Sequence, residues 1–233
     1  MRHARAAWLV AIAAVLVWSA GARGVAAQTA ANPDPARFAA EIKAFEDFDR
    51  KNTVPKDAVL FVGSSSIRLW PTAERFPTLT VLNRGFGGSH ISDVNHYFDQ
   101  TVGRYAARVI VFYAGDNDVG SGKSIDQALS DYQAFVEKAH GAKADAEIFF
   151  IAVKPSLARW TLWPTMKAFN EKVRTFSASR PRLHFVDVAS PMLGADGRPR
   201  PELFVADGLH MTPAGYDVWT GLVSREIAPF VRR

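Results

Sequence analysis

Four short stretches carry the side chains in this sequence whose types and spacing suit covalent chemistry. A serine hydroxyl becomes a nucleophile only when a nearby base removes its proton, and a third group must orient that base. A serine, a histidine and a carboxylate therefore make a sufficient set for acyl transfer. The stretches that could supply them are Gly63-Ser64-Ser65-Ser66, Gly85-Phe86-Gly87-Gly88-Ser89, Gly115-Asp116-Asn117-Asp118 and Asp207-Gly208-Leu209-His210.

Ser65 is the candidate nucleophile. It follows an apolar run, and the residues from Ile67 to Trp70 are typical of the start of a helix. Backbone N–H groups at a helix N-terminus favour the negative charge that develops during acyl transfer. The alternative is that the three serines only cap the helix, because serine is a common N-cap residue.

His210 is the candidate base, and Asp207 is the group that would orient it. An aspartate and a histidine three residues apart can meet across one turn, and the pair precedes a predicted helix. The alternative is that both are ordinary polar residues of a loop, because this short pattern is common. His90, beside the glycine-rich stretch, is the only rival for the base, whereas His140 and His184 are typical of structural histidines.

Three N–H groups are candidates for an oxyanion hole: the backbone of Ser65, the backbone of Gly88 and the side-chain amide of Asn117. The loss of one such donor costs about 2.7–4 kcal/mol of transition-state stabilisation. The alternative for the glycines is a tight turn. Asp116 and Asp118 lack the remaining ligands of a calcium-binding loop, so we expect no metal.

The pattern along the chain indicates the elements that position these residues. Apolar runs predict buried strands at 58–62, 109–113, 148–153 and 183–188, with a weaker strand at 80–82. Helical patterns occupy 36–50, 89–101, 124–140, 164–179 and 212–231. Alternating strands and helices predict a doubly wound α/β sandwich of three layers. In such folds ligands bind at the carboxyl ends of the strands, where the first three polar stretches lie.

The N-terminal residues predict export. Arg2 and Arg5 precede an uncharged segment, 6–22, and small residues end at Ala27. This order is typical of a secretory signal peptide, here residues 1–27. Its apolar part is shorter than the roughly 20 residues of a membrane span, so we expect no stable span after cleavage. The alternative is an uncleaved anchor. Either way we expect a periplasmic or secreted protein, with residues 28–233 forming a single domain of 233 − 27 = 206 residues.

The composition excludes several classes of function. There is no cysteine, so thiol catalysis, Cys-ligated zinc and disulfides are excluded. The net charge is +5, and three arginines of the signal segment account for part of it, which leaves +5 − 3 = +2. The other basic residues are scattered, so we expect no nucleic-acid partner.

In this order, the four stretches resemble the conserved blocks of the SGNH (GDSL-like) hydrolase family. Phe61 to Ser65 is similar to the first block, GDS, although Ser64 stands where the family usually has Asp. The second block is similar to Asn83 to Gly88, the third, GxND, to Gly115 to Asp118, and the fifth, DGxHxxxxGY, to Asp207 to Tyr216. The match spans residues 57–220.

The resemblance implies a flavodoxin-like sheet of five parallel strands and ester hydrolysis without a metal or cofactor. It implies Ser65 as nucleophile, His210 and Asp207 as its partners, and Gly88 and Asn117 as oxyanion donors. The substitution at Ser64 leaves Ser64 and Ser66 open as nucleophiles, and Gly87 is the alternative to Gly88.

These observations predict an exported serine esterase acting on a small-molecule or glycan ester. One rival is an inactive module of the same fold that binds an acylated glycan. Another is a phosphate-binding α/β protein, but the Gly-Ser loop lacks the following GK[ST]. Residues that could line a substrate pocket or pack in the core are Trp70, Trp160 and Trp163, and residues that could bind a polar or anionic group are Lys154, Ser156 and Arg159.

Overall fold

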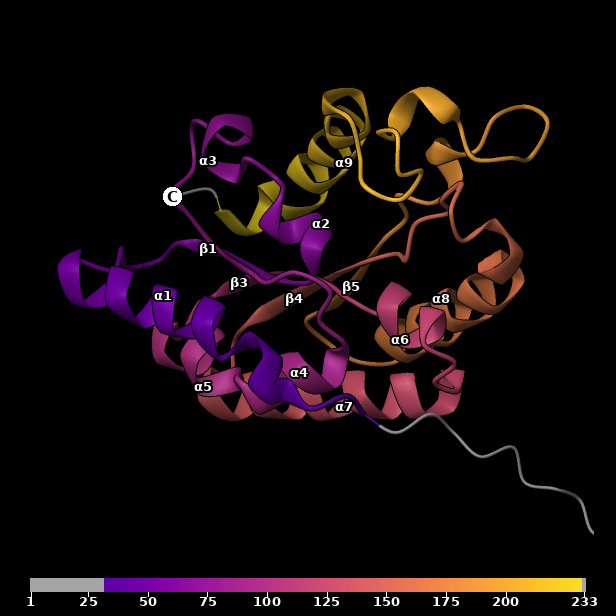
Figure 1. Ribbon diagram of the computed structural model, residues 1–233. Helices are drawn as coiled ribbons and strands as arrows, with labels where there is room; N and C mark the ends of the chain where they lie inside the picture. Colours follow the sequence, from indigo (N-terminus) through magenta and orange to yellow (C-terminus); the bar gives the residue numbers. More distant parts are fainter. Residues whose placement is uncertain (1–31, 232–233) are drawn as a thin grey trace, which may run out of the picture.

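A computed structural model describes residues 32–231, and the predicted signal peptide lies outside them. Five parallel strands form one sheet in the order β2-β1-β3-β4-β5, with helices on both faces (Figure 1). The strands are β1 (Val59–Gly63), β2 (Val81–Gly85), β3 (Val109–Tyr113), β4 (Glu147–Ile151) and β5 (Leu183–Val186). This strand order is the flavodoxin-like order, so the predicted three-layer α/β fold is confirmed.

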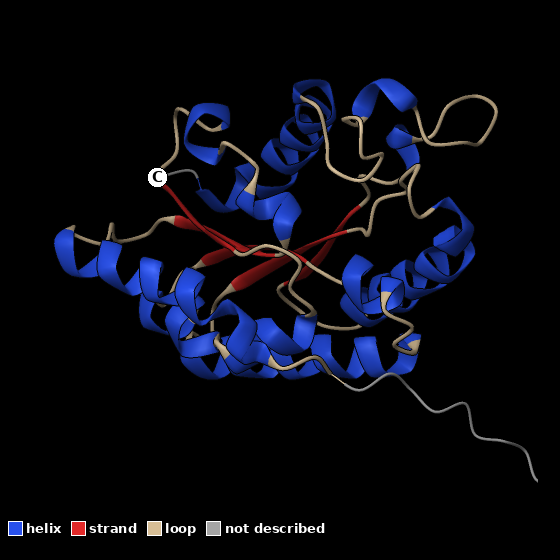
Figure 2. Ribbon diagram, in the orientation of Figure 1, coloured by secondary structure: helices blue, strands red, loops and turns tan. Residues whose placement is uncertain are grey.

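The helices divide between the two faces of the sheet (Figure 2). One face packs against α1 (Ala39–Lys51), α4 (Ile91–His96), α5 (Phe98–Thr101), α7 (Ile125–Ala142) and α8 (Trp163–Ala178). The other packs against α2 (Ser65–Arg68), α3 (Thr72–Arg75) and α9 (Pro213–Val231). Short helical turns complete the chain: η1 (Pro35–Phe38), η2 (Gly103–Tyr105), α6 (Asp116–Gly120), η3 (Trp160–Leu162), η4 (Ser190–Met192) and η5 (Pro201–Leu203).

Strand side chains point alternately into two hydrophobic cores. Leu60 and Val62 of β1 join the core beneath α1 and α7, whereas Val59 and Phe61 join the core beneath α9. All five residues of β1 are buried, because helices cover both faces of a parallel sheet. This double burial explains why the central strands are continuous apolar runs.

Two predicted elements differ most from the structure. The weak strand at 80–82 is a full strand, Val81–Gly85, and its polar residues mark it as an edge strand with part of its surface open. The helix predicted at 89–101 is two short helices, α4 and α5, which join at Tyr97. Among the described helices, none combines the length and the apolar character that a membrane crossing requires.

The ends of three neighbouring strands lie level with one another. Gly63 pairs with Gly85 on one side and with Tyr113 on the other. Gly63 has φ of +135°, and a Cβ on it would lie 1.9 Å from the carbonyl oxygen of Tyr113. Only glycine fits there. The three polar stretches after β1, β2 and β3 therefore emerge at one edge of the sheet.

Candidate active site

Ser65 is the first residue of α2, directly after β1. The backbone of Ser64 is extended and its N–H donates to the carbonyl oxygen of Tyr113 at 2.9 Å. This bond ties the turn to the neighbouring strand. The Ser65 side chain is half-buried, and its backbone N–H lies in the first turn, where it has no acceptor within the helix.

His210 meets Ser65 from the loop before α9. Nε2 of His210 lies 3.0 Å from Oγ of Ser65, and Nδ1 lies 2.6 Å from Oδ2 of Asp207. Asp207 also accepts the backbone N–H of Leu209 at 2.8 Å and of His210 at 2.9 Å. The same carboxylate therefore stabilises the turn and orients the imidazole.

The charge of Asp207 determines which nitrogen of His210 carries the proton. The hydrogen bond from His210, together with the backbone N–H groups, lowers the pKa of Asp207 to about 2. An ionised carboxylate only accepts hydrogen bonds, so Nδ1 of His210 must donate. Nε2 is then free to accept the proton of the Ser65 hydroxyl, which is the arrangement that activates a serine.

The neighbouring serines are placed differently. Ser64 is fully buried, and its Oγ has no hydrogen-bond partner within residues 32–231. Ser66 is 1% exposed, and its Oγ accepts from Nζ of Lys154 at 3.2 Å. Of the three serines, Ser65 is the one that the structure brings to His210.

The two predicted oxyanion donors after β2 and β3 are linked to each other. Gly88 has φ of +75° and is exposed, and its N–H has no acceptor among the described residues. Asn117 donates from Nδ2 to the carbonyl oxygen of Ser89 at 3.1 Å. Asp118 accepts the N–H of Ile91 at 3.2 Å. These bonds connect the glycine loop, residues 85–89, and the start of α4 to the turn that carries Asn117.

Gly87, the alternative to Gly88, has its N–H occupied. It donates to Oε2 of Glu41 at 3.2 Å, and the same carboxylate oxygen accepts from Arg68 at 3.2 Å. Glu41 thus joins α1 to both the glycine loop and the helix of Ser65. The free N–H of Gly88 makes it the better-placed donor of the two.

A buried ion pair lies behind Ser66. Nζ of Lys154, at the end of β4, contacts Oδ2 of Asp116 and the hydroxyl of Tyr113, each at 3.1 Å. Burial lowers the pKa of Lys154, and the Asp116 carboxylate offsets only part of that effect. Lys154 and Ser156 are 1% and 2% exposed, so the prediction that they bind a substrate group is wrong. The lysine instead supports the turn after β3.

His90, the rival base, does not reach Ser65 in the described contacts. It is 5% exposed and its Nδ1 lies 3.8 Å from Oδ1 of Asp118. Burial lowers the pKa of His90 to about 4. His140 and His184 bond to Ala146 and Glu147, at 3.0 Å and 2.8 Å, as expected of structural histidines.

The three tryptophans have different surroundings. Trp70 is 2% exposed and its ring packs among core aromatic rings. Trp160 and Trp163 stack with centroids 6.3 Å apart. Trp160 also borders a cavity of about 390 Å³ that is otherwise lined by Leu157 and by residues between 194 and 202, and neither Ser65 nor His210 lines it. Next to Leu157, the N–H of Ala158 donates to the carbonyl oxygen of Gly208 at 3.0 Å.

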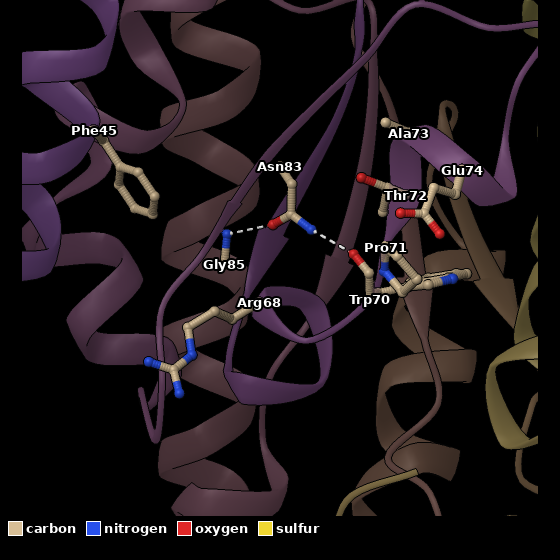
Figure 3. Close-up of a pocket in the computed structure, with 9 residues that line it drawn as sticks. All are labelled: Phe45, Arg68, Trp70, Pro71, Thr72, Ala73, Glu74, Asn83 and Gly85. Atoms are coloured by element: carbon tan, nitrogen blue, oxygen red, sulfur yellow. Dashed lines mark hydrogen bonds between the residues drawn. The ribbon is translucent and has the colours of Figure 1, made fainter. Parts of the chain in front are cut away.

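A separate pocket of about 330 Å³ lies on the outer side of α2, next to the edge strand β2 (Figure 3). There Asn83 donates to the carbonyl oxygens of Ile67 and Trp70, and accepts the N–H of Gly85. Neither Ser65 nor His210 lines this pocket. Its residues anchor the helix of the nucleophile rather than form the reacting site.

Three supporting contacts were not predicted from the sequence: those of Glu41 with Gly87 and Arg68, the ion pair of Lys154 with Asp116, and the bond from Arg159 to Asn117 at 3.0 Å. The sequence does offer one indication that Lys154 is buried, because it directly follows an uninterrupted apolar run, residues 148–153. Within residues 32–231, no cluster of histidine and carboxylate side chains is arranged to hold a metal ion.

One family model covers the part of the chain that carries most of the residues described above. The family model described as GDSL-like Lipase/Acylhydrolase family matches residues 70–218. That range begins just after Ser65 and includes Gly88, Asn117, Asp207 and His210.

A curated relative and two solved structures give the degree of similarity. The platelet-activating factor acetylhydrolase IB subunit alpha1 of Bos taurus is 25% identical over 175 residues, 72% of this chain and 73% of the relative. A protein from Streptococcus pneumonia, provisionally described as a platelet activating factor, has a TM-score of 0.73 at 20% identity, covering 84% of this chain and 94% of its own. A GDSL-like lipase from Bacteroides thetaiotaomicron has a TM-score of 0.70 at 21% identity, covering 84% and 98%. The two structures show the shared fold.

Proposed function

The chain belongs to the GDSL-like Lipase/Acylhydrolase family and is a hydrolase acting on ester bonds, and from this premise we propose that it is an exported serine esterase that works through an acyl-enzyme. Ser65 is the nucleophile, His210 the base and Asp207 the residue that orients it. The observation that carries this proposal is the continuous relay from Oγ of Ser65 to Nε2 of His210 at 3.0 Å and from Nδ1 to Asp207 at 2.6 Å.

The mechanism has two halves. In the first, Nε2 of His210 takes the proton of Ser65 as Oγ attacks the ester carbonyl carbon. The tetrahedral oxyanion accepts hydrogen bonds from the N–H of Ser65, the N–H of Gly88 and the amide of Asn117. As it collapses, the alkoxy group leaves with the proton from His210, and Ser65 keeps the acyl group.

In the second half, water takes the place of the alcohol. His210 removes a proton from the water as its oxygen attacks the acyl carbon, and the same donors hold the second oxyanion. Collapse then breaks the bond to Oγ of Ser65, which regains its proton from His210. The acid leaves and the enzyme is restored.

The substrate we propose is a small-molecule or glycan ester. The bovine relative is named an acetylhydrolase, so acetyl is the first acyl group to test.

The test compares hydrolysis of p-nitrophenyl esters, from acetate to octanoate, by the mature protein and by Ser65→Ala. We expect turnover to be lost in Ser65→Ala with the fold retained. The matched control is Ser64→Ala, which removes a buried hydroxyl with no partner among the described residues and should therefore keep turnover. Turnover that survives in Ser65→Ala would refute the assignment of the nucleophile.

The alternative function is an inactive module that binds an acylated glycan. The intact relay from Ser65 to Asp207 argues against it, because a binding module has no need of an activated serine. Covalent labelling of Ser65 by a fluorophosphonate separates the two functions. Glycan binding in the absence of labelling would favour the module.

Export is proposed from the sequence of residues 1–27, with its early arginines, uncharged segment and small residues before Gln28. Expression of the full chain in a Gram-negative host, followed by fractionation and mass spectrometry, tests it. We expect a periplasmic or secreted product that begins at Gln28. A cytoplasmic product that retains Met1 would contradict the proposal.

A further inference from the structure

Arg159 follows β4 and reaches two consecutive residues of the turn after β3. Its Nη2 donates to Oδ1 of Asn117 at 3.0 Å, and its Nη1 lies 3.6 Å from Oδ2 of Asp116. The guanidinium packs against α6, where a Cβ on Gly120 would lie 3.1 Å from Cζ of Arg159. The head group therefore has a defined position that faces the protein, although 22% of the side chain is exposed.

This contact determines how the Asn117 amide is oriented. The amide oxygen accepts from Arg159, and Nδ2 donates to the carbonyl oxygen of Ser89 at 3.1 Å, so one N–H remains. A guanidinium only donates hydrogen bonds. A flipped amide would set its NH₂ group against Arg159 and its oxygen against the carbonyl of Ser89. Both contacts are repulsive, so the flipped orientation is excluded.

We propose that Arg159 is the positioning residue that holds and polarises the Asn117 amide as an oxyanion donor, an inference that rests on the proposed esterase function. A bond from a charged donor to the amide oxygen withdraws electron density from the amide nitrogen and strengthens its remaining N–H as a donor. A donor that is already fixed also needs no reorganisation when the oxyanion forms. Arg159 acts through Asn117 and does not touch the substrate.

Direct binding of an anionic substrate by Arg159 fits this geometry less well. Nη2 is engaged with Asn117, and Nη1 is closed off from solvent beside Asp116. Burial tends to raise the pKa of Asp116, but the charges of Lys154 and Arg159, together with the hydrogen bonds from Lys154 and Tyr113, outweigh that effect and lower it. The ionised carboxylate lies beside Nη1 of Arg159 on the side of the guanidinium that is closed to solvent, so this part of the head group faces the protein and not a substrate.

The test is a double-mutant cycle between Arg159→Met and Asn117→Ala, with kcat and KM measured for p-nitrophenyl acetate. Methionine keeps much of the length of the side chain and removes the hydrogen bond. We expect Arg159→Met to lower kcat about 10- to 100-fold, less than the 10²–10³ of losing the donor itself, with KM nearly unchanged. In the Asn117→Ala background the same substitution should have no further effect. The rate of Ser65 phosphonylation by a p-nitrophenyl phosphonate should follow kcat.

Each other outcome has a defined meaning. An equal loss of kcat in both backgrounds, no loss at all, or a change confined to KM for anionic esters would each overturn the proposal. Full turnover in Asn117→Ala alone would instead show that the oxyanion assignment fails. If Arg159→Met does not fold, Arg159→Lys enters the same cycle, because lysine keeps the charge without the guanidinium fork. Arg180→Met, an exposed arginine on Phe176, is the matched control with unchanged kcat.

Discussion

Nζ of Lys154 lies 3.1 Å from Oδ2 of Asp116, and both side chains are almost closed to solvent, at 1% and 7% exposed. The pair joins the ends of β4 and β3 directly behind the helix of Ser65. Removal of either member of the pair would leave a buried charge without its nearest partner, because the other cation beside Asp116, Arg159, lies farther away at 3.6 Å.

Replacement of Lys154 by methionine should therefore lower the free energy of unfolding by about 3–5 kcal/mol. The double variant Lys154→Met with Asp116→Asn should recover much of this loss, because neither buried charge of the pair is then left alone. Denaturant unfolding measures both. Lys172→Met, which removes an exposed ion pair to Asp126, is the control and should change stability by less than about 1 kcal/mol. Equal losses in the exposed and buried variants would contradict the argument.

Replacement of Asp207 by asparagine should reduce kcat by about 10³- to 10⁴-fold. The asparagine amide can donate to Nδ1 of His210, which moves the imidazole proton to Nε2 and leaves Ser65 without a base. Asp207→Ala should be milder, because water can take the place of the carboxylate. Steady-state kinetics on p-nitrophenyl acetate gives the comparison. Wild-type turnover in Asp207→Asn would mean that the tautomer of His210 is set by another group.

Stability should depend on pH through His90. Burial lowers its pKa from the ordinary 6.5 to about 4. Between these pH values the unfolded chain binds a proton that the folded chain does not, so stability rises with pH across this interval and is level above it. The charged groups around the imidazole are Arg37, Asp93, Asp118, Lys123 and Asp131.

For the native chain we expect the free energy of unfolding to fall by about 2 kcal/mol as the pH is lowered from 6.5 to 4. In His90→Gln this part of the slope should disappear, whatever the variant's stability at neutral pH. Denaturant unfolding at a series of pH values gives the slope. An identical slope in the two proteins would assign the pH dependence to other groups.

Replacement of Gly63 by alanine should prevent folding, because the new Cβ would lie 1.9 Å from the carbonyl oxygen of Tyr113. The control is Gly141→Ala in α7, where a Cβ meets no atom within 4 Å. There alanine should stabilise the protein by up to about 1 kcal/mol, because it is the better helix former. Soluble expression and thermal unfolding measure both. A folded Gly63→Ala variant would show that β1 and β3 can separate at this point.

The sequence predicts the fold well where burial is complete. The run at Val109–Tyr113 is apolar throughout because both of its faces are covered, and its predicted bounds match those of the strand. The edge strand Val81–Gly85 was underestimated because Asn83 and Arg84 interrupt its apolar pattern. Their side chains bond to α2 and α1 through Ile67 and Asp49, which local hydrophobicity does not reveal.

The proposed reacting residues were predictable because each lies in a short motif, but their supports were not. Lys154 pairs with Asp116 across 38 positions, and a lysine after a strand is equally typical of a substrate contact. Only the adjacency of β3 and β4 brings the two together. The role of Glu41 was equally hidden in the sequence. Its partners Gly87 and Arg68 are distant in the chain and come close to α1 only in the folded protein.

Ser65 and His210 are 145 positions apart in the chain, yet their side chains are in contact. A second long-range bond lies beside this contact, because the hydroxyl of Tyr216 in α9 donates to the carbonyl oxygen of Ser66 at 3.0 Å. Contacts between residues so far apart form late in folding, since the entropy of closing the loop must first be offset. A chain that has emerged only as far as β5 therefore holds Ser65 without its base. Ester hydrolysis should begin only when α9 has docked, so its onset reports the completion of folding.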